Sequence, residues 1–355
     1  LVTASSPSVI CRGNSSACSS MVGGAISRAS ARPRAARPRQ ITLGLDAVTN
    51  LDMPREAPRA VALCGLGGSA AGGRLFTALF AEYLTVPAVA VDTTSLPGWI
   101  GEDDLVVCTS YSGNTRETLD LWEEAGIRGA RRIAVTAGGE LAERAARDGC
   151  PCALVEAGYQ PRGALGFLLG AQAAVLTRSR VAVGSAGALA ATVPQLTVAV
   201  AQCQHDRDAL AAEAAQLAGK AIVLYGSGAR AAAALRLKNQ INENAKAPAF
   251  ANAMPEMAHN EVLGWIGTQR HGAAAAAIFL RDPAEPEHAA RLHDRIEELV
   301  RGDVETVLRW EGSGEDEAER TLGLLIRGDV VSCLLAEAEG VDALDIARLT
   351  SLKGL

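Results

Sequence analysis

The sequence predicts an α/β fold of two doubly wound units, each a parallel sheet covered by helices on both faces. Short apolar runs alternate with amphipathic stretches from residue 59 onward, which is typical of strand–helix–strand units. The apolar runs are continuous rather than alternating with polar residues, which favours strands buried on both faces. A strand, Gly-rich turn and helix recur about 160 residues later, which indicates two similar α/β halves.

The first unit is expected to contain five strands, which we place at residues 60–64, 88–91, 105–109, 132–136 and 152–155. Each is a short run rich in Ala, Val, Leu, Ile or Cys. Helices are expected at residues 70–83, at 115–125 and from 140 onward. Since right-handed crossovers join such strands, the sheet should be parallel.

A second unit follows after a helical stretch. Residues 165–177 are apolar nearly all round and predict a buried helix. Residues 184–219 are Ala-rich and helical, with a break near Pro194. The alternation then restarts with a strand at 221–225 and a helix at 229–245. Weaker strand patterns lie at 274–280, at 304–310 and around Ser332. We therefore divide the chain into an N-terminal unit at 46–180 and a C-terminal unit at 181–355.

Composition excludes several classes of protein. The 355 residues suit two domains, and 48% hydrophobic with 21% charged residues allows a sizeable core. We expect no membrane partner, because no uninterrupted apolar run reaches about 18–20 residues. A net charge of −6 argues against a general nucleic-acid binder. The eight cysteines show no zinc or redox spacing and are interpreted as reduced packing residues.

Residues 1–45 differ from the remainder. They contain six Arg and no Asp or Glu, which leaves −12 for the rest of the chain. A Ser- and Arg-rich, acid-poor segment resembles an organellar transit peptide. The alternative is a non-native or untranslated upstream segment, because a possible start, Met21, follows. Under either interpretation we expect a disordered basic head outside the fold.

Two Gly- and hydroxyl-rich turns predict an anion site. The turn at 65–69 contains Gly68 and Ser69, and the turn at 110–115 contains Ser110, Ser112 and Thr115. In a parallel sheet both turns lie at the carboxyl edge, where helix N-termini offer unpaired N–H groups to phosphate. The alternative for each hydroxyl is simple helix capping. Neither the dinucleotide glycine spacing nor a Walker lysine is present.

The second unit holds the densest polar segments. Glu243 stands near the end of a helix built mainly from Ala and Leu, and His259 follows in a loop. A carboxylate and an imidazole are the groups best suited to move protons near neutral pH. Composition alone favours the simpler interpretation, in which Glu243 is an exposed helix residue and His259 is a surface or capping histidine.

Together these residues form a series that resembles the bifunctional phosphoglucose/phosphomannose isomerase family of the sugar isomerase (SIS) superfamily. The matching motifs occur in family order over about residues 60–355: GLGGS at 65–69, SYSGNT at 110–115 with ETL at 117–119, TAGG at 136–139, QPR at 160–162, NENAK at 242–246, PE at 255–256 and HNE at 259–261. The SYSGNT turn identifies only the superfamily, whereas NENAK followed by PE and HNE is more specific.

The resemblance implies a role for each matched residue. Gly68, Ser69, Ser110, Ser112 and Thr115 would hold the sugar phosphate. Arg162 would face a developing enediolate, and Glu243 would move a proton between C1 and C2. His259 would assist ring opening from the neighbouring subunit of a homodimer, and Lys353 would lie near the ring oxygen. Arg162 could instead be a surface arginine, and Lys353 part of a fraying tail.

The resemblance also implies a cytoplasmic aldose–ketose isomerase of hexose 6-phosphates that needs no cofactor and no metal. An organelle becomes the alternative location if residues 1–40 are a transit peptide. Ile346 departs from the family, where a small polar residue is expected seven positions before Lys353. That departure bears on glucose-versus-mannose specificity. Two alternatives stay open, namely another SIS isomerase for a pentose or amino sugar phosphate, and a non-catalytic sugar-phosphate sensor.

Overall fold

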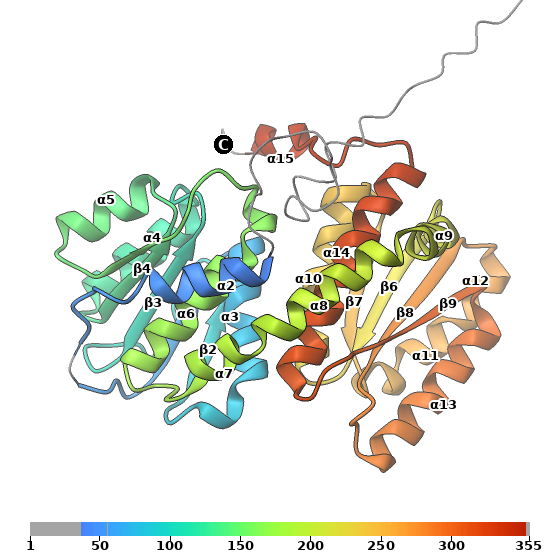
Figure 1. Ribbon diagram of the computed structural model, residues 1–355, viewed down its shortest axis with the longest axis horizontal. Coiled ribbons are helices and arrows are strands. Elements are labelled where there is room, and N and C mark those ends of the chain that lie inside the picture. The colour runs from blue at the N-terminus through green and yellow to red at the C-terminus, as the bar shows by residue number, and fades with distance from the viewer. Residues whose placement is uncertain (1–36, 55, 353–355) are drawn as a thin grey trace, which may run out of the picture.

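The computed structural model describes residues 37–54 and 56–352, and it consists of two α/β halves lying side by side (Figure 1). The first half contains a five-stranded sheet of order β2-β1-β3-β4-β5, in which every pairing is parallel. Its strands are β1 (Val61–Cys64), β2 (Ala88–Val91), β3 (Leu105–Ser110), β4 (Arg131–Thr136) and β5 (Cys152–Leu154). All five predicted strands are therefore confirmed, with small changes at their ends.

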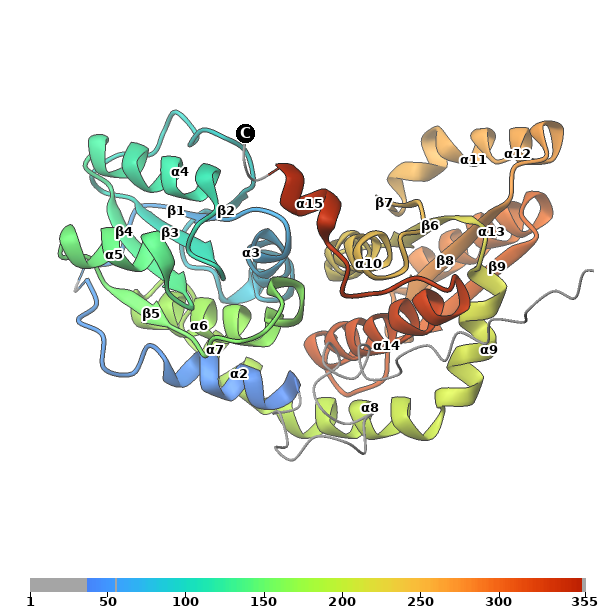
Figure 2. The same cartoon turned by 90° about the horizontal axis from the view of Figure 1, so that it is seen from above.

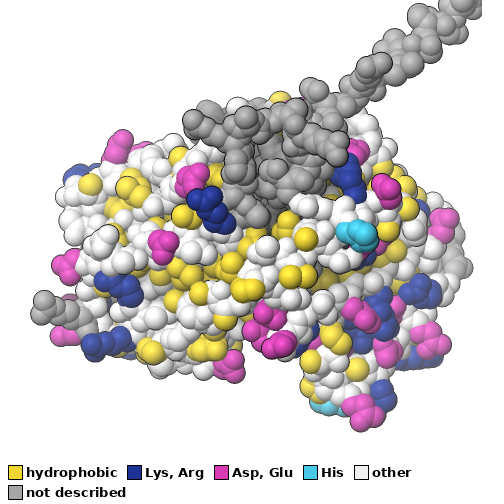
Figure 3. Space-filling view, in the orientation of Figure 1, with side chains coloured by type: hydrophobic (Ala, Val, Ile, Leu, Met, Phe, Trp, Pro, Cys, Tyr) yellow, Lys and Arg dark blue, Asp and Glu magenta, His cyan; other side chains and the backbone are white. Residues whose placement is uncertain are grey.

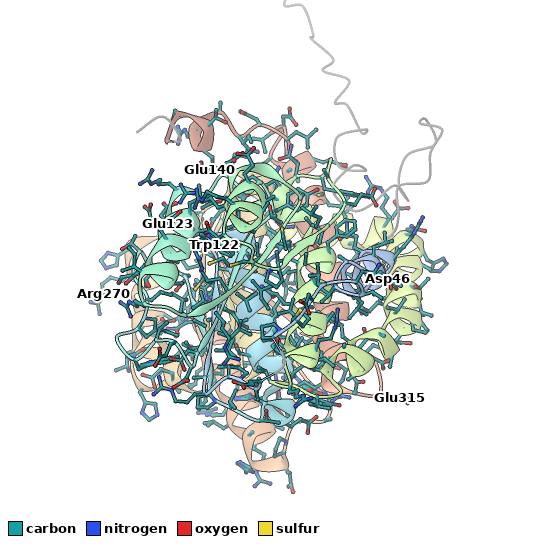
Figure 4. All side chains as sticks on the ribbon, turned by 90° about the vertical axis from the view of Figure 1, so that its left-hand side faces the viewer. Asp46, Trp122, Glu123, Glu140, Arg270 and Glu315 are labelled. Atoms are coloured by element: carbon teal, nitrogen blue, oxygen red, sulfur yellow. The ribbon has the colours of Figure 1, made fainter. Side chains whose placement is uncertain are left out.

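Helices cover both faces of the first sheet. One face packs on α3 (Gly68–Leu79) and α6 (Leu165–Arg178), and the other packs on α4 (Arg116–Ile127) and α5 (Gly139–Arg147). Alternate residues of each strand point into the two clusters, as Leu63 and Cys64 of β1 do. On the outer side, Arg144 of α5 bridges Glu123 of α4 and Glu140, which lie near each other above Trp122 (Figure 4). The first half thus has the predicted three-layer arrangement.

The second half repeats this plan with four parallel strands in the order β7-β6-β8-β9. These strands are β6 (Ala221–Gly226), β7 (Ala249–Ala253), β8 (Ala275–Arg281) and β9 (Thr306–Glu311). One face is covered by α9 (Arg207–Leu217), α10 (Ala229–Ala245) and α14 (Glu317–Ala338). The opposite face is covered by η3 (Glu256–His259), α11 (Glu261–Gly264), α12 (Ile266–His271) and α13 (Glu287–Asp303).

Three sequence predictions need correction. Residues 37–46, assigned mostly to the head, form helix α2 (Arg37–Asp46), whose Ile41 is buried against α6. The strand expected around Ser332 is wrong, because Ser332 is buried inside the helix α14. Strand β7 was not predicted, since its sequence AFANA lacks an apolar run. The rest of the predicted head, residues 1–36, lies outside the described residues.

The two halves are joined by helices. Helix α3 packs against α10, and α7 (Ser185–Ala191) leads into α8 (Val193–His205), which contacts both α2 and α14. Figure 3 shows hydrophobic side chains across the middle of this face, where Figure 1 draws α2 and α8. By length and composition, Ser185–His205 would suffice to cross a membrane, although core helices of other proteins pass the same test.

One hydrophobic cluster runs through both halves. It contains the α3-facing side of the first sheet, the α10-facing side of the second sheet, and the helices between them. The halves therefore share a core, and the carboxyl edges of their sheets are held in a fixed relation to one another.

Candidate active site

The two predicted anion-binding turns meet at the carboxyl edge of the first sheet. β1 and β3 are neighbours with Cys64 opposite Cys108, so the turns that follow them lie side by side. The Tyr111 backbone N–H donates to Ser69 Oγ at 3.3 Å, which joins the two turns directly. Gly67 has φ +54°, a conformation that L side chains rarely adopt, and it lets the chain turn into α3.

The hydroxyl groups of the second turn gather around Ser110. Thr115 Oγ1 lies 2.9 Å from Ser110 Oγ, and Gly113 N–H donates to Ser110 Oγ at 3.1 Å. The Ser112 hydroxyl, which is exposed, accepts from Asn114 N–H at 3.3 Å. Thr115 occupies the N-cap position of α4, yet its side chain makes no capping hydrogen bond. Capping therefore does not explain the Thr115 side chain, and its hydroxyl faces the same turn as Ser110.

Tyr111 fixes the shape of this turn. Its ring is buried, and its hydroxyl donates to Glu156 O at 2.9 Å and accepts from Tyr159 N–H at 3.0 Å. Burial is the largest influence on this phenol and raises its pKa. Tyr111 thus stays neutral. Its two hydrogen bonds connect the turn at 110–115 to the segment that leads to Arg162.

Arg162 crosses from the first half to the second. It belongs to η2 (Pro161–Gly163) and is only 4% exposed, so the alternative of a surface arginine is wrong. The side chain makes three contacts: Nε donates to Asn244 Oδ1 at 2.9 Å, Nη1 approaches Glu243 Oε2 at 3.4 Å, and Nη2 donates to Ala343 O at 2.7 Å. A Cβ placed on Gly68 would lie 3.5 Å from Arg162 Cα, so the phosphate turn adjoins this arginine.

Glu243 is the solvent-accessible member of its ion pair with Arg162. It lies near the end of α10, and its side chain is 27% exposed, compared with 4% for Arg162. A carboxylate that is both accessible and paired with a buried guanidinium can exchange a proton with a bound molecule while the guanidinium stabilises negative charge. Figure 2 shows α15 (Ala347–Leu352) between α10 and the first half, beside this region.

His259 is not joined to Glu243 within the described part of one chain. His259 is exposed at the end of η3, and no hydrogen bond or ion pair among the described residues joins it to Glu243. Its neighbour Glu261 is held by Tyr225, whose hydroxyl donates to Glu261 Oε2 at 2.8 Å. Burial, followed by Glu261, raises the pKa of Tyr225 far above its ordinary value. Lys353 lies outside the described residues, and Ile346 is half-buried just before α15.

Sequence reasoning missed the buried polar groups behind Arg162. Arg236 donates to Arg162 O at 2.6 Å and pairs with Asp329 of α14 at 3.5 Å, and both residues are buried. Asn244 is buried as well, and its amide donates to Ser332 Oγ at 2.9 Å. A charged residue within an Ala- and Leu-rich helix was the available signal, since such a residue needs a buried partner.

The second half contains a closed counterpart of the anion turn. Gly228 has φ +55° and ψ −128°, close to the φ +54° and ψ −124° of Gly67. Where the first half has Ser69, two residues after this glycine, the second half has buried Arg230. Arg230 Nη1 donates to Asp282 Oδ2 at 2.7 Å, and Arg320 Nε lies 2.7 Å from Asp282 Oδ1. A carboxylate of the chain itself therefore occupies this edge of the second sheet.

Comparisons with known families agree with this geometry. Residues 56–150 match the SIS domain model, and residues 207–355 match the bacterial phospho-glucose isomerase C-terminal SIS domain. The fold is shared with the C-terminal domain of glucosamine-fructose-6-phosphate aminotransferase from Francisella tularensis. That structure has a TM-score of 0.70 at 12% identity over 86% of this chain and 95% of the other. Tagatose-6-phosphate ketose/aldose isomerase from Escherichia coli gives 0.60 at 16% identity, over 86% and 92%. The chain is thus a protein of two SIS domains.

Curated relatives identify the family within the class of SIS proteins. The bifunctional phosphoglucose/phosphomannose isomerase of Aquifex aeolicus is 32% identical over 83% of this chain and 89% of its own length. The enzyme of the same name from Caldicellulosiruptor bescii is 30% identical over 82% and 88%. The chain belongs to the bifunctional phosphoglucose/phosphomannose isomerase family. The D-glucosamine-6-phosphate 4-epimerase of Sulfolobus acidocaldarius is also similar, at 31% identity over 57% of this chain and 62% of its own length.

Proposed function

We propose that this protein interconverts glucose 6-phosphate and mannose 6-phosphate with fructose 6-phosphate through a cis-enediolate. Family membership supports this isomerase activity, and the contact between Glu243 and Arg162 beside the hydroxyl turns carries the residue assignment. In the proposal, the hydroxyls of Ser69, Ser110, Ser112 and Thr115 bind the phosphate, and Gly68 lets its backbone approach. The binding energy of this remote group then positions C1 and C2 for reaction.

The chemistry follows from the two side chains. The Glu243 carboxylate removes a proton from one carbon of the C1–C2 pair and returns it to the other. The negative charge that develops on the enediolate oxygens is stabilised by the Arg162 guanidinium, which its buried contacts hold in place beforehand. The isomerisation is an intramolecular oxidation–reduction in which C2 is oxidised as C1 is reduced, so it consumes no external oxidant or reductant.

The assignment of Glu243 is tested by coupled turnover of fructose 6-phosphate. Glu243→Gln keeps the size of the side chain but removes the base, and kcat should fall by roughly 10²- to 10⁴-fold. Glu298→Gln is the matched control, because Glu298 is an exposed carboxylate on α13 that pairs with nearby Arg295, three residues before it. An unchanged rate in Glu243→Gln would remove Glu243 as the base.

We also propose a homodimer in which His259 enters the site of the neighbouring subunit and assists ring opening. Its exposure within its own chain supports this, as do three exposed apolar side chains on the neighbouring elements β7, α11 and α12: Phe250, Leu263 and Ile266. Mixing inactive Glu243→Gln and His259→Ala subunits tests the arrangement. A mixed dimer would rebuild one intact site, so activity should return to about a quarter of wild type after full exchange. Absence of recovery would place His259 in its own subunit's site or outside catalysis.

Sugar specificity is tested separately. Parallel assays with glucose 6-phosphate and mannose 6-phosphate measure the ratio of the two activities, on which the departure at Ile346 bears. Ile346→Thr should shift that ratio toward mannose 6-phosphate. The similarity to a D-glucosamine-6-phosphate 4-epimerase makes glucosamine 6-phosphate the third substrate to assay. Turnover of that compound alone would favour an amino-sugar function over the hexose isomerase.

The cytoplasmic location also stays a proposal. Fusing residues 1–45 to a fluorescent protein tests the transit-peptide alternative, and delivery of the fusion to an organelle would establish it.

A further inference from the structure

Lys246 has an unusual backbone position at the end of α10. It adopts the left-handed conformation with φ +56°, where glycine is the usual residue. Its side chain turns back, and Nζ donates to three backbone carbonyls: Glu243 O at 2.9 Å, Asn244 O at 3.4 Å and Asp342 O at 2.6 Å. The first two belong to the last turn of α10, whereas Asp342 lies in the segment after α14.

These three carbonyls belong to residues that contact the Arg162 side chain or directly precede such a residue. Arg162 has three side-chain partners, namely Glu243, Asn244 and the carbonyl of Ala343. Lys246 binds the backbone of the first two partners and of the residue directly before the third. The ammonium group therefore connects the segments that contact the Arg162 side chain, and its three acceptors are all backbone carbonyls.

We propose that Lys246 is a positioning residue that assembles the pocket of the Arg162 side chain and so fixes the guanidinium against Glu243. The proposal rests on the proposed function, in which Arg162 and Glu243 act on the substrate. Helix capping by a terminal lysine accounts for the contacts within α10 but not for the contact with Asp342, 96 residues away.

The charge of Lys246 is set by groups on three elements. Burial and the positive charge of Arg162 on η2 lower the pKa of the Lys246 ammonium, whereas Asp345 and Asp342 of the C-terminal segment and Glu243 of α10 oppose that shift. Loss of the ammonium proton at alkaline pH removes one donor and the charge. Wild-type kcat should therefore decline at a lower pH than an ordinary lysine would impose.

Two variants separate the ammonium from the backbone. Lys246→Gly removes the side chain and suits the left-handed conformation, so the end of α10 keeps its shape. Lys246→Met also removes the ammonium but retains a side chain in the same strained position. Both variants should lower kcat for fructose 6-phosphate by roughly 10- to 100-fold, because misplacing a catalytic group by about 1 Å has such an effect. KM should stay within about threefold of wild type, since the phosphate turns lie on other elements.

A second measurement does not depend on activity. Arg162 is 4% exposed, so labelling by phenylglyoxal, followed by mass spectrometry, should be slow in wild type and clearly faster in both variants. The alkaline decline of kcat should also disappear in Lys246→Gly. If wild type itself lacks isomerase activity, the proposed function fails, and Arg162 labelling still decides the role of Lys246.

Several outcomes would overturn the proposal. Wild-type kcat in Lys246→Gly would show that the ammonium is not needed. If kcat fell in Lys246→Met but not in Lys246→Gly, the cause would be the strained backbone conformation rather than loss of the ammonium group. A rise in KM at constant kcat would place Lys246 in substrate binding. If Arg162 stayed protected from phenylglyoxal in both variants, Lys246 would have no role in positioning Arg162.

Discussion

Asn244 joins Arg162 to α14: its Oδ1 accepts a 2.9 Å hydrogen bond from Arg162 Nε, and its Nδ2 donates one of 2.9 Å to Ser332 Oγ. The amide is buried, so neither contact has water as a substitute. The orientation of the Arg162 guanidinium therefore depends in part on a buried amide that is itself bound to α14.

Replacement of Asn244 by Ala should lower both activity and stability. The variant leaves the buried Nε donor of Arg162 without its acceptor, at a cost of about 1–3 kcal/mol in unfolding free energy. Denaturant unfolding and fructose 6-phosphate turnover measure the two effects. Ser332→Ala is the graded control, because it removes the outer hydrogen bond of Asn244 and the bond from Ser332 Oγ to Asp329 O but keeps the contact of Asn244 with Arg162. It should leave kcat within about threefold of wild type. Equal losses of kcat in the two variants would contradict a direct role of Asn244 in orienting Arg162.

Thr115 and Thr118 provide a matched pair on α4. Thr115→Val should raise KM for fructose 6-phosphate about tenfold, because a hydrogen bond to a charged phosphate is worth about 1.5–3 kcal/mol. Thr118 is buried, and its hydroxyl has no hydrogen-bond partner among the described residues. Thr118→Val should therefore leave KM unchanged and keep or increase stability. A similar rise of KM in both variants would indicate general damage to α4 rather than loss of a phosphate ligand.

Gly67 and Gly228 test the duplicated turns. Both adopt a positive φ near +55°, so an Ala at either position should cost about 1–3 kcal/mol of stability. Only Gly67→Ala should also weaken substrate binding, because the second turn faces the ion pair of Arg230 and Asp282. Thermal unfolding and KM, measured on both variants, check this difference. An increased KM in Gly228→Ala would show that the second turn also contributes to the site.

Asp282→Ala should be strongly destabilising, by about 3–5 kcal/mol, because it leaves Arg230 and Arg320 buried without this carboxylate. The vacated position has the character of an anion site, so sulfate should stabilise this variant more than it stabilises wild type. Thermal unfolding in sulfate and in chloride at equal ionic strength measures the difference. An identical sulfate effect in both proteins would contradict our interpretation of the second turn as closed by its own carboxylate.

Asp104 should contribute to acid sensitivity. Burial raises the pKa of its carboxyl, but hydrogen bonds from Arg59 and from Gly101 N–H outweigh burial, and the pKa lies below its ordinary value. A depressed pKa stabilises the fold above the unfolded-state pKa, and that stabilisation disappears as pH falls through the folded-state pKa. Asp104→Asn should therefore be less stable than wild type at pH 7, with the difference shrinking toward pH 3. A constant difference across that range would exclude this linkage.

The sequence predicted the elements whose local pattern is strong. Helix α10 begins and ends where expected, because its Ala- and Leu-rich pattern continues without interruption to the polar NENAK segment. Strand β7 escaped prediction because it is a short edge strand whose Asn252 interrupts the apolar pattern. Helix α2 was hidden by the acid-poor composition around it, although packing against α6 rather than composition decides its structure.

The site was predictable only in part for a similar reason. Ser69 and Ser110 follow neighbouring parallel strands, so topology alone brings them together. Arg162 and Glu243 are 81 residues apart and were linked only through the family resemblance. The contacts of Lys246 with Asp342 and of Arg230 with Asp282 depend on how α10 packs against α14 and β8 within the second half. No local sequence pattern encodes such pairs.

The hydrophobic core that runs through both halves limits how this enzyme can move. A hinge between the halves would have to separate α3 from α10 and expose apolar surface, which is costly. The protein should therefore unfold in a single transition rather than half by half, and cleavage of the chain between β5 and β6 should leave the pieces associated. We therefore expect the motion that admits the sugar to come from short segments around the site, such as the exposed helix α15 beside α10.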